Sequence, residues 1–416
     1  METKAGDPGA FAHFDLDRVD SPAFVVDAAK LRANCQVLAE IRDEADIKVL
    51  SALKAFSMWS AAPIIGEYLD GVCTSGLWEA RLASEFYDGE ISTYCAAYKP
   101  EELDEVCRLS DHVIFNSPGQ MHRAGLILEN ARASGQNFEV GLRINPQVPT
   151  GEVPRYDPSS PGSRLGFPLD QLTPEMMEGV DGIHFHNLCE QDLEPLIQTW
   201  DRVFDAIEPW FGQLKWINMG GGHHITRADY QREELVEFLK DAKDDTGAEI
   251  YLEPGEAVAL DAGILVGTIL DTGFNGLPVA IADVSATCHM PDVIEAPYRP
   301  AMLHEKAGEP PVRLGADVAQ LNTGAHAVQG ILAALLMRER TGEGQFVDVN
   351  MLRTLMHLRG MMWTSHSEGA DDWWGFHQDT YVKPADHGYR TSDGSLLIGG
   401  MGGVAEEEFN GLLRDL

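Results

Sequence analysis

The sequence lacks the features of membrane, secreted and disulfide-bonded proteins. No apolar run is long enough to cross a bilayer, and the first residues, METKAGDPGAFAHFD, have no apolar core of a secretory signal. The 6 cysteines are scattered without a Cys-x-x-Cys pair, which favours free thiols over a disulfide framework. We therefore expect a cytoplasmic protein without a membrane partner.

Positive charge is also scarce. The 416 residues hold 31 Lys and Arg against 66 Asp and Glu, which gives a formal net charge of −35. This excess repels nucleic acid and anionic membranes, so we expect neither as a partner. It would attract a cationic small molecule. An acidic surface also serves solubility in a salty cytoplasm, however, and does not by itself specify a ligand.

Short apolar runs alternate with amphipathic stretches, such as 193–211 and 232–245, through the first 260 residues. Continuous apolar strands separated by helices are typical of a parallel sheet covered on both faces. About eight such strands predict an α/β fold with a closed, TIM-like β/α barrel over 28–260, and an open doubly wound sheet is the alternative. The strand-like runs are AFVVD (23–27), VLSALK (49–54), GVCTS (71–75), ISTYC (91–95), HVIFN (112–116), VGLRIN (140–145), GIHFH (182–186), WINMG (216–220) and IYLEP (250–254).

The pattern changes after residue 260. The runs 264–274 and 278–286 have no helix between them, so they predict antiparallel strands of a β-rich domain over 261–306. We expect the N-terminal segment, 1–27, to join that domain. A Pro/Gly-rich junction and a long apolar helix at 323–344 then mark a third segment, 307–416.

Four strand ends of the predicted barrel carry polar residues or glycines. Lys54 ends VLSALK, His184 and His186 lie in GIHFHNLCE, three glycines follow WINM, and Glu253 ends YLE. Reactive groups of β/α barrels stand at these carboxyl ends, so the four segments face one site. Each feature alone has an ordinary explanation: a lysine that reaches water, a core histidine, a tight turn or a strand-end carboxylate.

Together these groups supply what pyridoxal 5′-phosphate (PLP) needs. A lysine among apolar residues loses its proton more readily and can then form a Schiff base with a carbonyl cofactor. Backbone N–H groups of a glycine turn close on a phosphate, a flat imidazole stacks on the ring, and a carboxylate keeps the pyridine nitrogen protonated. The adjacent His223 and His224 point apart on an extended backbone, so we expect no metal site there.

The resemblance to a known family rests on several motifs in a fixed order. Residues 20 to about 305 resemble the fold-type III PLP decarboxylases of the alanine racemase type. Within that group they are most similar to the carboxynorspermidine (carboxyspermidine) decarboxylases. The matching stretches are SALKAFS, CTSGLWEARLA, GLRINPQV, SRLGF, GIHFHNLCEQ, WINMGGGHHIT, YLEPGEAV and CHMPDVIEAPYRP.

The resemblance implies a role for each matching residue. Lys54 corresponds to the Schiff-base lysine, His186 to the ring-stacking histidine and Glu253 to the partner of the pyridine nitrogen. The remaining matches are the phosphate-loop glycines Gly221, Gly222 and Gly255, a basic residue near the cofactor, Arg164, and a segment near the substrate that contains Asp292 and Glu295. We expect those two acids to hold the amines of a carboxylated polyamine, which a homodimer would decarboxylate to norspermidine or spermidine.

The chain departs from this family beyond residue 305. The resemblance implies a later cysteine-and-acid motif that the partner subunit donates, yet no cysteine follows Cys288. The segment PVRLGADVAQLNTGAHAVQGILAALLMRERTGEGQFVDVNML instead resembles an internal piece of a family III CoA-transferase of the formyl-CoA or carnitinyl-CoA type, and GYRTSDGSLLIGG resembles the next segment of that family.

The C-terminal segment lacks the residue that its own resemblance makes essential. The catalytic aspartate of the CoA-transferases corresponds to Gln320, whose amide cannot act as a carboxylate nucleophile, and Asp317 comes three positions early. The sequence leaves three hypotheses: a PLP decarboxylase with a foreign C-terminal segment, an inactive chimeric fusion, and a CoA-transferase, which Gln320 disfavours. A racemase would need a tyrosine in the replaced region.

Overall fold

The structure is a computed structural model that describes residues 9–151, 157–274, 278–295 and 300–303, the single residues 328, 331, 334, 335, 338 and 340, and residues 389–391 and 394–396. By internal contacts the chain divides into Phe24–Val266 and a second unit of Met1–Ala23 with Gly267–Leu416. The predicted boundaries 1–27, 28–260, 261–306 and 307–416 stay predictions, and Gln320 lies outside the described residues.

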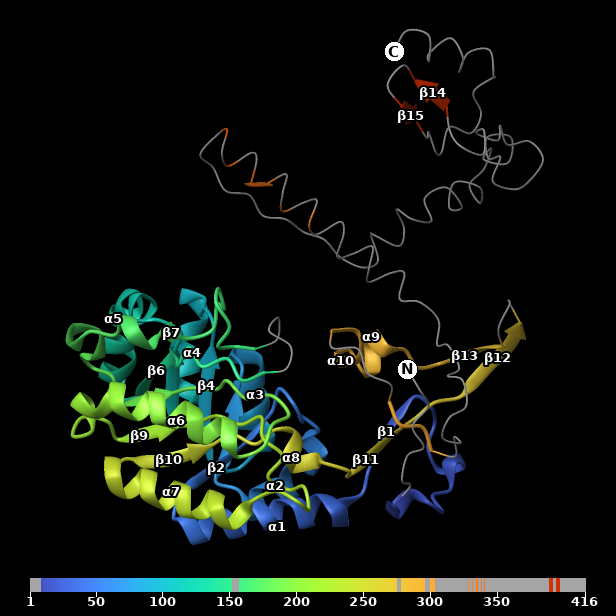
Figure 1. The fold of residues 1–416 in the computed structure, drawn as a ribbon, viewed down its shortest axis with the longest axis horizontal. Helices are drawn as coiled ribbons and strands as arrows, with labels where there is room; N and C mark the ends of the chain where they lie inside the picture. Colours follow the sequence, from blue (N-terminus) through green and yellow to red (C-terminus); the bar gives the residue numbers. More distant parts are fainter. Residues whose placement is uncertain are drawn as a thin grey trace. The chain divides into compact units, whose positions relative to one another are not determined.

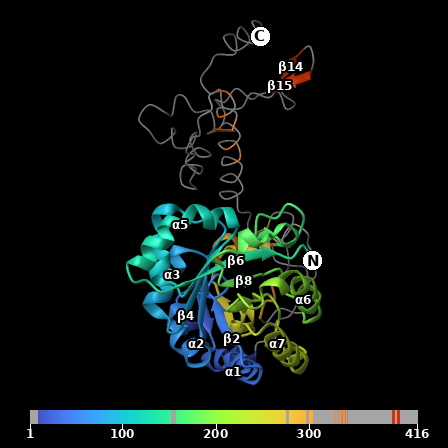
Figure 2. The ribbon, with the colours of Figure 1, turned by 90° about the vertical axis from the view of Figure 1, so that its left-hand side faces the viewer.

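The first unit contains a closed barrel of eight parallel strands (Figures 1 and 2). Their order around the barrel is β2-β3-β4-β5-β6-β8-β9-β10, and β10 pairs back with β2, so the predicted barrel is confirmed and the open sheet is wrong. The barrel strands are β2 (Lys48–Ala52), β3 (Gly71–Thr74), β4 (Glu90–Cys95), β5 (His112–Phe115), β6 (Glu139–Asn145), β8 (Gly182–His184), β9 (Trp216–Asn218) and β10 (Glu249–Leu252), and the short β7 (Phe167–Pro168) pairs with the end of β6.

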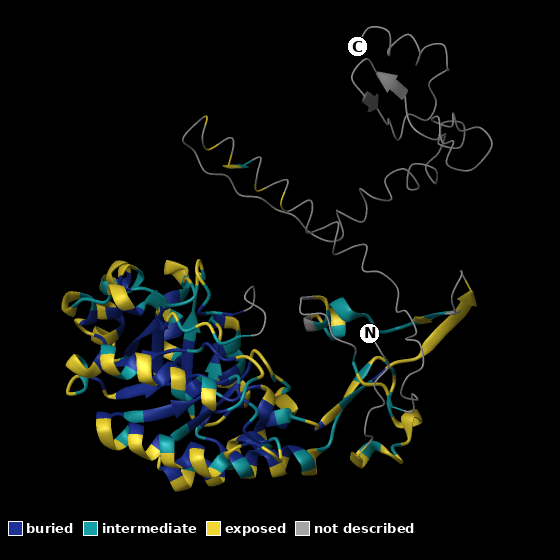
Figure 3. Ribbon diagram, in the orientation of Figure 1, coloured by how far each residue is buried: buried dark blue, intermediate teal, exposed yellow. Residues whose placement is uncertain are grey.

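Amphipathic helices cover the outside of the barrel. In α1 the buried Leu31 and Leu38 repeat at helical spacing, Asp27 caps the helix by accepting the N–H of Ala29 at 2.8 Å, and the left-handed Asp46 (φ 52°) ends it. Figure 3 shows the resulting pattern, with buried strands inside and exposed outer helix faces. The helices are α1 (Ala28–Ala45), α2 (Ala62–Tyr68), α3 (Leu77–Phe86), α4 (Pro100–Leu109), α5 (Pro118–Ala133), α6 (Glu194–Ile207), α7 (Arg232–Thr246) and α8 (Glu256–Ala259), and the 3₁₀ turns of this unit are Trp59–Ala61, Leu169–Gln171, Pro174–Met177 and Glu208–Trp210.

One large side chain, Trp216, fills much of the barrel interior. It is 2% exposed, and its ring stacks on His112 with centroids 4.5 Å apart. Gly141 and Gly182 on neighbouring strands make room for the indole, because a Cβ at Gly182 would lie 2.0 Å from the Trp216 Cδ2 atom. The interior of the barrel is therefore a packed core, and side chains that can contact a ligand lie at the ends of the strands.

The described part of the second unit contains short strands, 3₁₀ turns and short helices. β12 (Ile269–Phe274) and β13 (Pro278–Ala282) form an antiparallel hairpin, which confirms the predicted antiparallel pair. The predicted run 264–274 is divided, however, because its start forms β11 (Gly263–Val266), which belongs to the first unit and pairs with β1 (Ala23–Val26). The other elements are two 3₁₀ turns (Gly9–Phe11 and Leu16–Arg18), α9 (Ala286–His289), α10 (Asp292–Glu295), β14 (Tyr389–Thr391) and β15 (Gly394–Leu396).

Two further sequence predictions concern a helix over 323–344 and the lack of a membrane-spanning segment. The predicted helix 323–344 lies outside the described residues, apart from six single residues. Among the helices that the structure describes, none combines the length and the apolar character that crossing a membrane requires.

Candidate active site

Four neighbouring strands bring the predicted groups to one end of the barrel. In the strand order, β2, β10, β9 and β8 are consecutive, and all run parallel. Lys54 follows β2, Glu253 follows β10, the glycine turn that begins at Gly220 follows β9, and His184 ends β8. The carboxyl ends of these strands therefore form the candidate site.

Lys54 contacts His186 directly. Its Nζ atom lies 3.0 Å from the Nε2 atom of His186, although the two residues are 132 positions apart in the sequence. The side chain of Lys54 is exposed, so the expectation of apolar surroundings is wrong. Lys54 lies beyond the last residue of β2, where the chain turns out of the core and water reaches the amine. Its immediate neighbour is an imidazole ring.

The His186 ring joins Lys54 to the glycine turn. Its Nδ1 atom lies 3.1 Å from the Gly221 carbonyl oxygen and 3.2 Å from the Gly221 nitrogen. A neutral imidazole can donate to the carbonyl or accept from the N–H through that atom, but not both at once. Burial, followed by the charges of Lys54 and Arg143, lowers the pKa of His186 well below its ordinary value. His186 is therefore neutral at physiological pH, and its tautomer decides which contact forms.

Glu253 is a carboxylate whose side chain is 11% exposed and whose two oxygens are both engaged. Asn218 Nδ2 donates to its Oε1 atom at 2.7 Å, and His184 Nε2 lies 3.2 Å from its Oε2 atom. Burial alone would raise the pKa of Glu253, but His184, the Asn218 hydrogen bond and the charge of Lys54 outweigh burial and lower the pKa to about 2. The site thus contains a carboxylate that stays ionised over the whole physiological range.

The glycine turn packs tightly against neighbouring loops. Gly220 (φ 70°) and Gly222 (φ 90°) have left-handed backbones that other residues rarely adopt. A Cβ at Gly221 would lie 1.9 Å from the Glu253 carbonyl oxygen, and one at Gly222 would lie 2.1 Å from that of Leu188. The glycines are therefore required for the approach of these loops to one another, and the same approach leaves their backbone close to Glu253 and His186.

Several residues that the sequence motifs did not identify line the same region. Arg143 is 4% exposed, donates to the His186 carbonyl oxygen at 2.8 Å and lies 4.5 Å over the Tyr94 ring. Burial, with Glu253 next, raises the pKa of the Cys73 thiol well above its ordinary value, which places that thiol near Glu253. A guanidinium within the apolar run VGLRIN was the one available signal of such an inward-facing polar group.

Four further residues, Arg164, Asp292, Glu295 and Gly255, were predicted to contribute to the site. Arg164 is exposed, and its carbonyl oxygen accepts from Asn116 Nδ2 at 2.9 Å. Asp292 and Glu295 begin and end α10 of the second unit, so their contact with substrate stays a prediction. Phosphate binding by Gly255 also stays a prediction. A Cβ at Gly255 would lie 2.7 Å from the Cβ of Ala55.

His223 and His224 have separate partners. His223 Nδ1 lies 2.6 Å from the Tyr230 hydroxyl, whereas His224 Nδ1 lies 3.8 Å from a Glu256 oxygen. Within the described residues, no three His, Cys, Asp or Glu side chains are grouped so that they could hold a metal ion.

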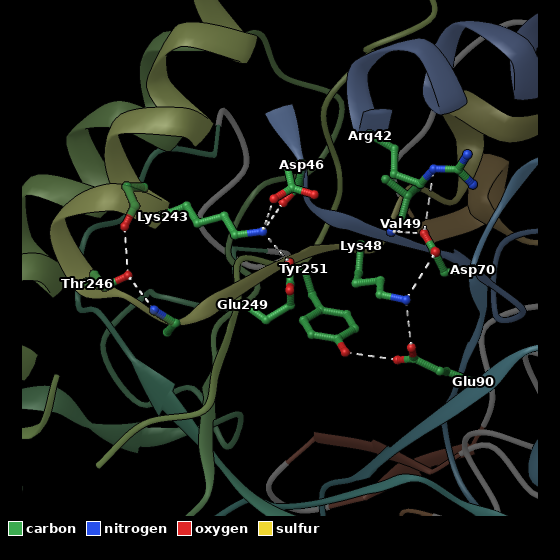
Figure 4. Close-up of polar contacts among 12 residues, drawn as sticks. Arg42, Asp46, Lys48, Val49, Asp70, Glu90, Lys243, Thr246, Glu249 and Tyr251 are labelled. Carbon is green, nitrogen blue, oxygen red and sulfur yellow. Dashed lines mark hydrogen bonds and ion pairs between the residues drawn. The ribbon is translucent and has the colours of Figure 1, made fainter. Parts of the chain in front are cut away.

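The opposite, amino end of the barrel carries ion pairs at the strand starts (Figure 4). Lys48 Nζ lies 3.1 Å from Glu90 and 3.3 Å from Asp70, and the Tyr251 hydroxyl donates to Glu90 at 2.9 Å. A cavity of about 670 Å³ opens at this end, lined by Glu90, Asp111, His112, Arg132, Asn137, Phe138, Glu139, Gly179, Asp181, Lys215 and Tyr251. Its carboxylates are paired or cap strand N–H groups, as Asp111 does for Ile91 at 2.8 Å, so this face stabilises the barrel.

The residues at the carboxyl end fit PLP. Lys54 offers an amine that solvent reaches, and His186 offers a flat neutral ring beside it. Glu253 offers an ionised carboxylate, which is the partner that a protonated pyridine nitrogen needs. Lys54, Glu253 and His186 follow β2, β10 and β8, and the glycine turn follows β9, which lies between β10 and β8. The amine, the carboxylate and the imidazole ring can therefore face one planar cofactor.

Known proteins match two parts of the chain. A carboxynorspermidine/carboxyspermidine decarboxylase from Campylobacter jejuni is 38% identical over 290 residues, which cover 70% of this chain and 74% of that protein. A carboxyaminopropylagmatine decarboxylase from Synechocystis is 34% identical over 287 residues, 68% of this chain and 73% of that protein. Residues 299–414 match the model of CoA-transferase family III, which agrees with the resemblance of the C-terminal segment.

A solved structure extends the first match to three dimensions. The crystal structure of carboxynorspermidine decarboxylase from Campylobacter jejuni, complexed with norspermidine, superposes with a TM-score of 0.60 at 39% identity. The superposition covers 67% of this chain and 72% of that chain. Sequence and fold therefore point to the same relatives for the barrel.

Proposed function

We propose that this chain, which belongs to the carboxynorspermidine/carboxyspermidine decarboxylase family, uses PLP to decarboxylate a carboxylated polyamine. The family is PLP-dependent. The observation that carries the proposal is the contact of Lys54 with His186 at 3.0 Å, beside a carboxylate, Glu253, whose pKa is about 2. The products would be norspermidine or spermidine.

His186 holds the amine of Lys54 at the carboxyl end of the barrel. His186 Nε2 can accept a hydrogen bond from Lys54 Nζ across the 3.0 Å contact when Nδ1 carries the ring proton and donates to the Gly221 carbonyl oxygen. A lysine that has lost its proton is the nucleophile that an aldehyde cofactor requires. Bound PLP would supply an electron sink for the electron pair left behind when CO₂ departs.

The other groups of the site would bind and orient the cofactor. Glu253 would keep a proton on the pyridine nitrogen, because the carboxylate itself does not take that proton above a pH of about 2. Backbone N–H groups of Gly221, Gly222 and Gly255 would bind the phosphate, with Arg164 as a nearby cation. His186 would cover one face of the ring.

The substrate would carry ammonium groups that acidic residues recognise. We assign this role to Asp292 and Glu295 of α10, in a homodimer. The relative solved with norspermidine and the relative named for carboxyaminopropylagmatine suggest three substrates to compare: carboxynorspermidine, carboxyspermidine and carboxyaminopropylagmatine. We expect the first two to be preferred.

Covalent trapping tests the cofactor link. The purified full chain is incubated with PLP, reduced with borohydride and mapped by peptide mass spectrometry. We expect a pyridoxyl adduct on Lys54, no adduct at that peptide in Lys54→Ala, and an unchanged adduct in Lys240→Ala, which alters an exposed lysine of α7. Wild-type protein without an adduct at Lys54 would refute the proposal.

Product assays separate the remaining hypotheses. CO₂ release from carboxynorspermidine supports the decarboxylase, whereas a Lys54 adduct without CO₂ release identifies an inactive chimeric fusion. The CoA-transferase alternative predicts acyl-CoA exchange. We expect none, because Gln320 replaces the aspartate that the resemblance makes essential.

A further inference from the structure

The carboxylate of Glu253 is held by two donors to which the family resemblance assigned no role. Asn218 at the end of β9 donates to Oε1 at 2.7 Å, and His184 at the end of β8 reaches Oε2 at 3.2 Å. Both donors are buried, with exposures of 0% for Asn218 and 2% for His184. A carboxylate held at each oxygen has one fixed plane and therefore one fixed direction in which its remaining lone pairs point.

The surroundings of His184 fix which of its ring nitrogens carries the proton. Burial lowers the pKa of His184 and outweighs the opposing effect of the Glu253 carboxylate, while Arg143 and Lys54 lower the pKa further, so the ring is neutral at physiological pH. Because Glu253 is ionised and can only accept, the single proton lies on Nε2. Nδ1 is then an acceptor, and it is buried without a hydrogen-bond partner among the described residues.

This arrangement is costly for a purely structural side chain. A buried acceptor without a partner loses its hydration and gains nothing in return, whereas an apolar side chain could pack against Tyr94, whose ring centroid lies 5.5 Å away. What His184 offers that an apolar residue cannot is the Nε2–H donor to Glu253. The free-energy cost of burying Nδ1 without a partner is explained if the Nε2–H donor to Glu253 has a function in the site.

We propose that His184 and Asn218 are positioning residues that aim the Glu253 carboxylate at the pyridine nitrogen of PLP. The inference rests on the proposed function, because it concerns how the chain holds that cofactor. His184 acts only through Glu253 and the ring nitrogen, so its contribution disappears if the cofactor has no nitrogen at that position.

A pair of cofactors tests this. The dissociation constants of PLP and of 1-deazapyridoxal 5′-phosphate, in which carbon replaces the pyridine nitrogen, are measured for the full chain by borohydride trapping over a concentration series. We expect His184→Phe, which keeps a ring against Tyr94 but has no donor, to weaken PLP binding about tenfold and to change binding of the analogue less than about twofold. His184→Gln keeps a donor, so this variant should bind PLP almost as tightly as the wild type.

The controls keep each outcome informative. His122→Gln changes an exposed histidine of α5 and should leave both dissociation constants unchanged. Equal weakening of both cofactors by His184→Phe would show a packing role and overturn the inference while the Lys54 adduct still stands. If circular dichroism shows that His184→Phe does not fold, Asn218→Ser carries the same comparison. Wild-type protein that forms no Lys54 adduct refutes both the proposed function and this inference.

Discussion

At the scale of single residues, the first unit buries several histidines in a neutral state. His223 is 4% exposed and contacts the Tyr230 hydroxyl at 2.6 Å, and burial lowers its pKa to about 4. Burial also lowers the pKa of His112, His184 and His186. Each of these rings takes up a proton more readily in the unfolded chain than in the folded one, so acid favours unfolding.

The protonation of His223 predicts a defined loss of stability. Its contribution is fully present above the ordinary histidine pKa of about 6.5 and is lost as the pH falls toward 4, with about 2 kcal/mol lost between pH 7.5 and pH 5. We expect His223→Gln, whose amide can still meet Tyr230, to reduce that loss by about this amount. Urea unfolding at the two pH values measures it.

The control for this prediction is another histidine. His122→Gln makes the same substitution at an exposed imidazole of α5, so it measures the effect of removing a histidine outside the core. An identical pH dependence in His223→Gln and the wild type would show that His223 is not the group that titrates. The other buried histidines would then carry the acid sensitivity.

The candidate site could be predicted as far as residue type and strand position allow. Lys54, His186 and Glu253 each follow an apolar run, and their meeting at one end of the barrel follows from parallel strands alone. The donors to Glu253 could not be predicted in the same way. His184 could be placed at a strand end facing the site, but only the β8–β9–β10 neighbourhood shows that His184 and Asn218 reach the same carboxylate.

At the scale of elements, the barrel depends on glycines inside its strands. Gly141 and Gly182 pair directly in the register of β6 and β8, and both face the Trp216 indole. The Trp216 ring cannot easily withdraw, because it stacks on His112 and packs edge-on against Tyr251 at 6.3 Å. Glycine in these strands is therefore a packing requirement and not a weakness.

A substitution at Gly182 tests this packing. Gly182→Ala places a Cβ within 2.0 Å of the indole, so we expect a loss of about 1–3 kcal/mol of unfolding free energy from overpacking. Trp216→Phe in the same chain should relieve the clash, and the double variant should be less destabilised than the sum of the two single variants. Urea unfolding of the four proteins measures the coupling.

Gly212 provides the matched control. No atom lies within 4 Å of a Cβ built there, so Gly212→Ala should change the unfolding free energy by no more than about 0.5 kcal/mol. Additive effects of Gly182→Ala and Trp216→Phe would contradict the packing argument.

Strand positions were easier to predict than strand ends. The predicted runs at 182–186 and 216–220 end two residues later than β8 (Gly182–His184) and β9 (Trp216–Asn218). After His184 and Asn218 the chain bends to form the site, and hydrophobicity alone does not mark that bend: Phe185 beyond β8 is fully buried. Burial continues past the point where strand pairing stops.

At the scale of the whole molecule, the chain joins segments related to two enzyme families. The barrel belongs with the decarboxylases, and residues 299–414 match CoA-transferase family III. The sequence motifs identified both parts, because each keeps its motifs in order. How the second segment affects the proposed decarboxylation could not be predicted, since that activity would depend on the complete substrate site and not on the barrel alone.

The excess of negative charge is also a property of the whole chain. A net charge of −35 means that repulsion among carboxylates opposes folding at low salt. Attraction within exposed ion pairs contributes little against it. Arg32 and Glu67, for example, form a pair in which the two side chains are 46% and 54% exposed, so solvent and salt screen most of their attraction.

Added salt should therefore stabilise this protein. Raising KCl from 0.1 M to 1 M shortens the screening length from about 10 Å to about 3 Å, which weakens the long-range repulsion more than the close ion pairs. We expect the thermal midpoint to rise over this range and then level off, with the same curve in choline chloride. A midpoint that falls with salt would mean that ion pairs outweigh repulsion. A rise that continues in proportion to concentration above 1 M would instead indicate exclusion of salt from the surface.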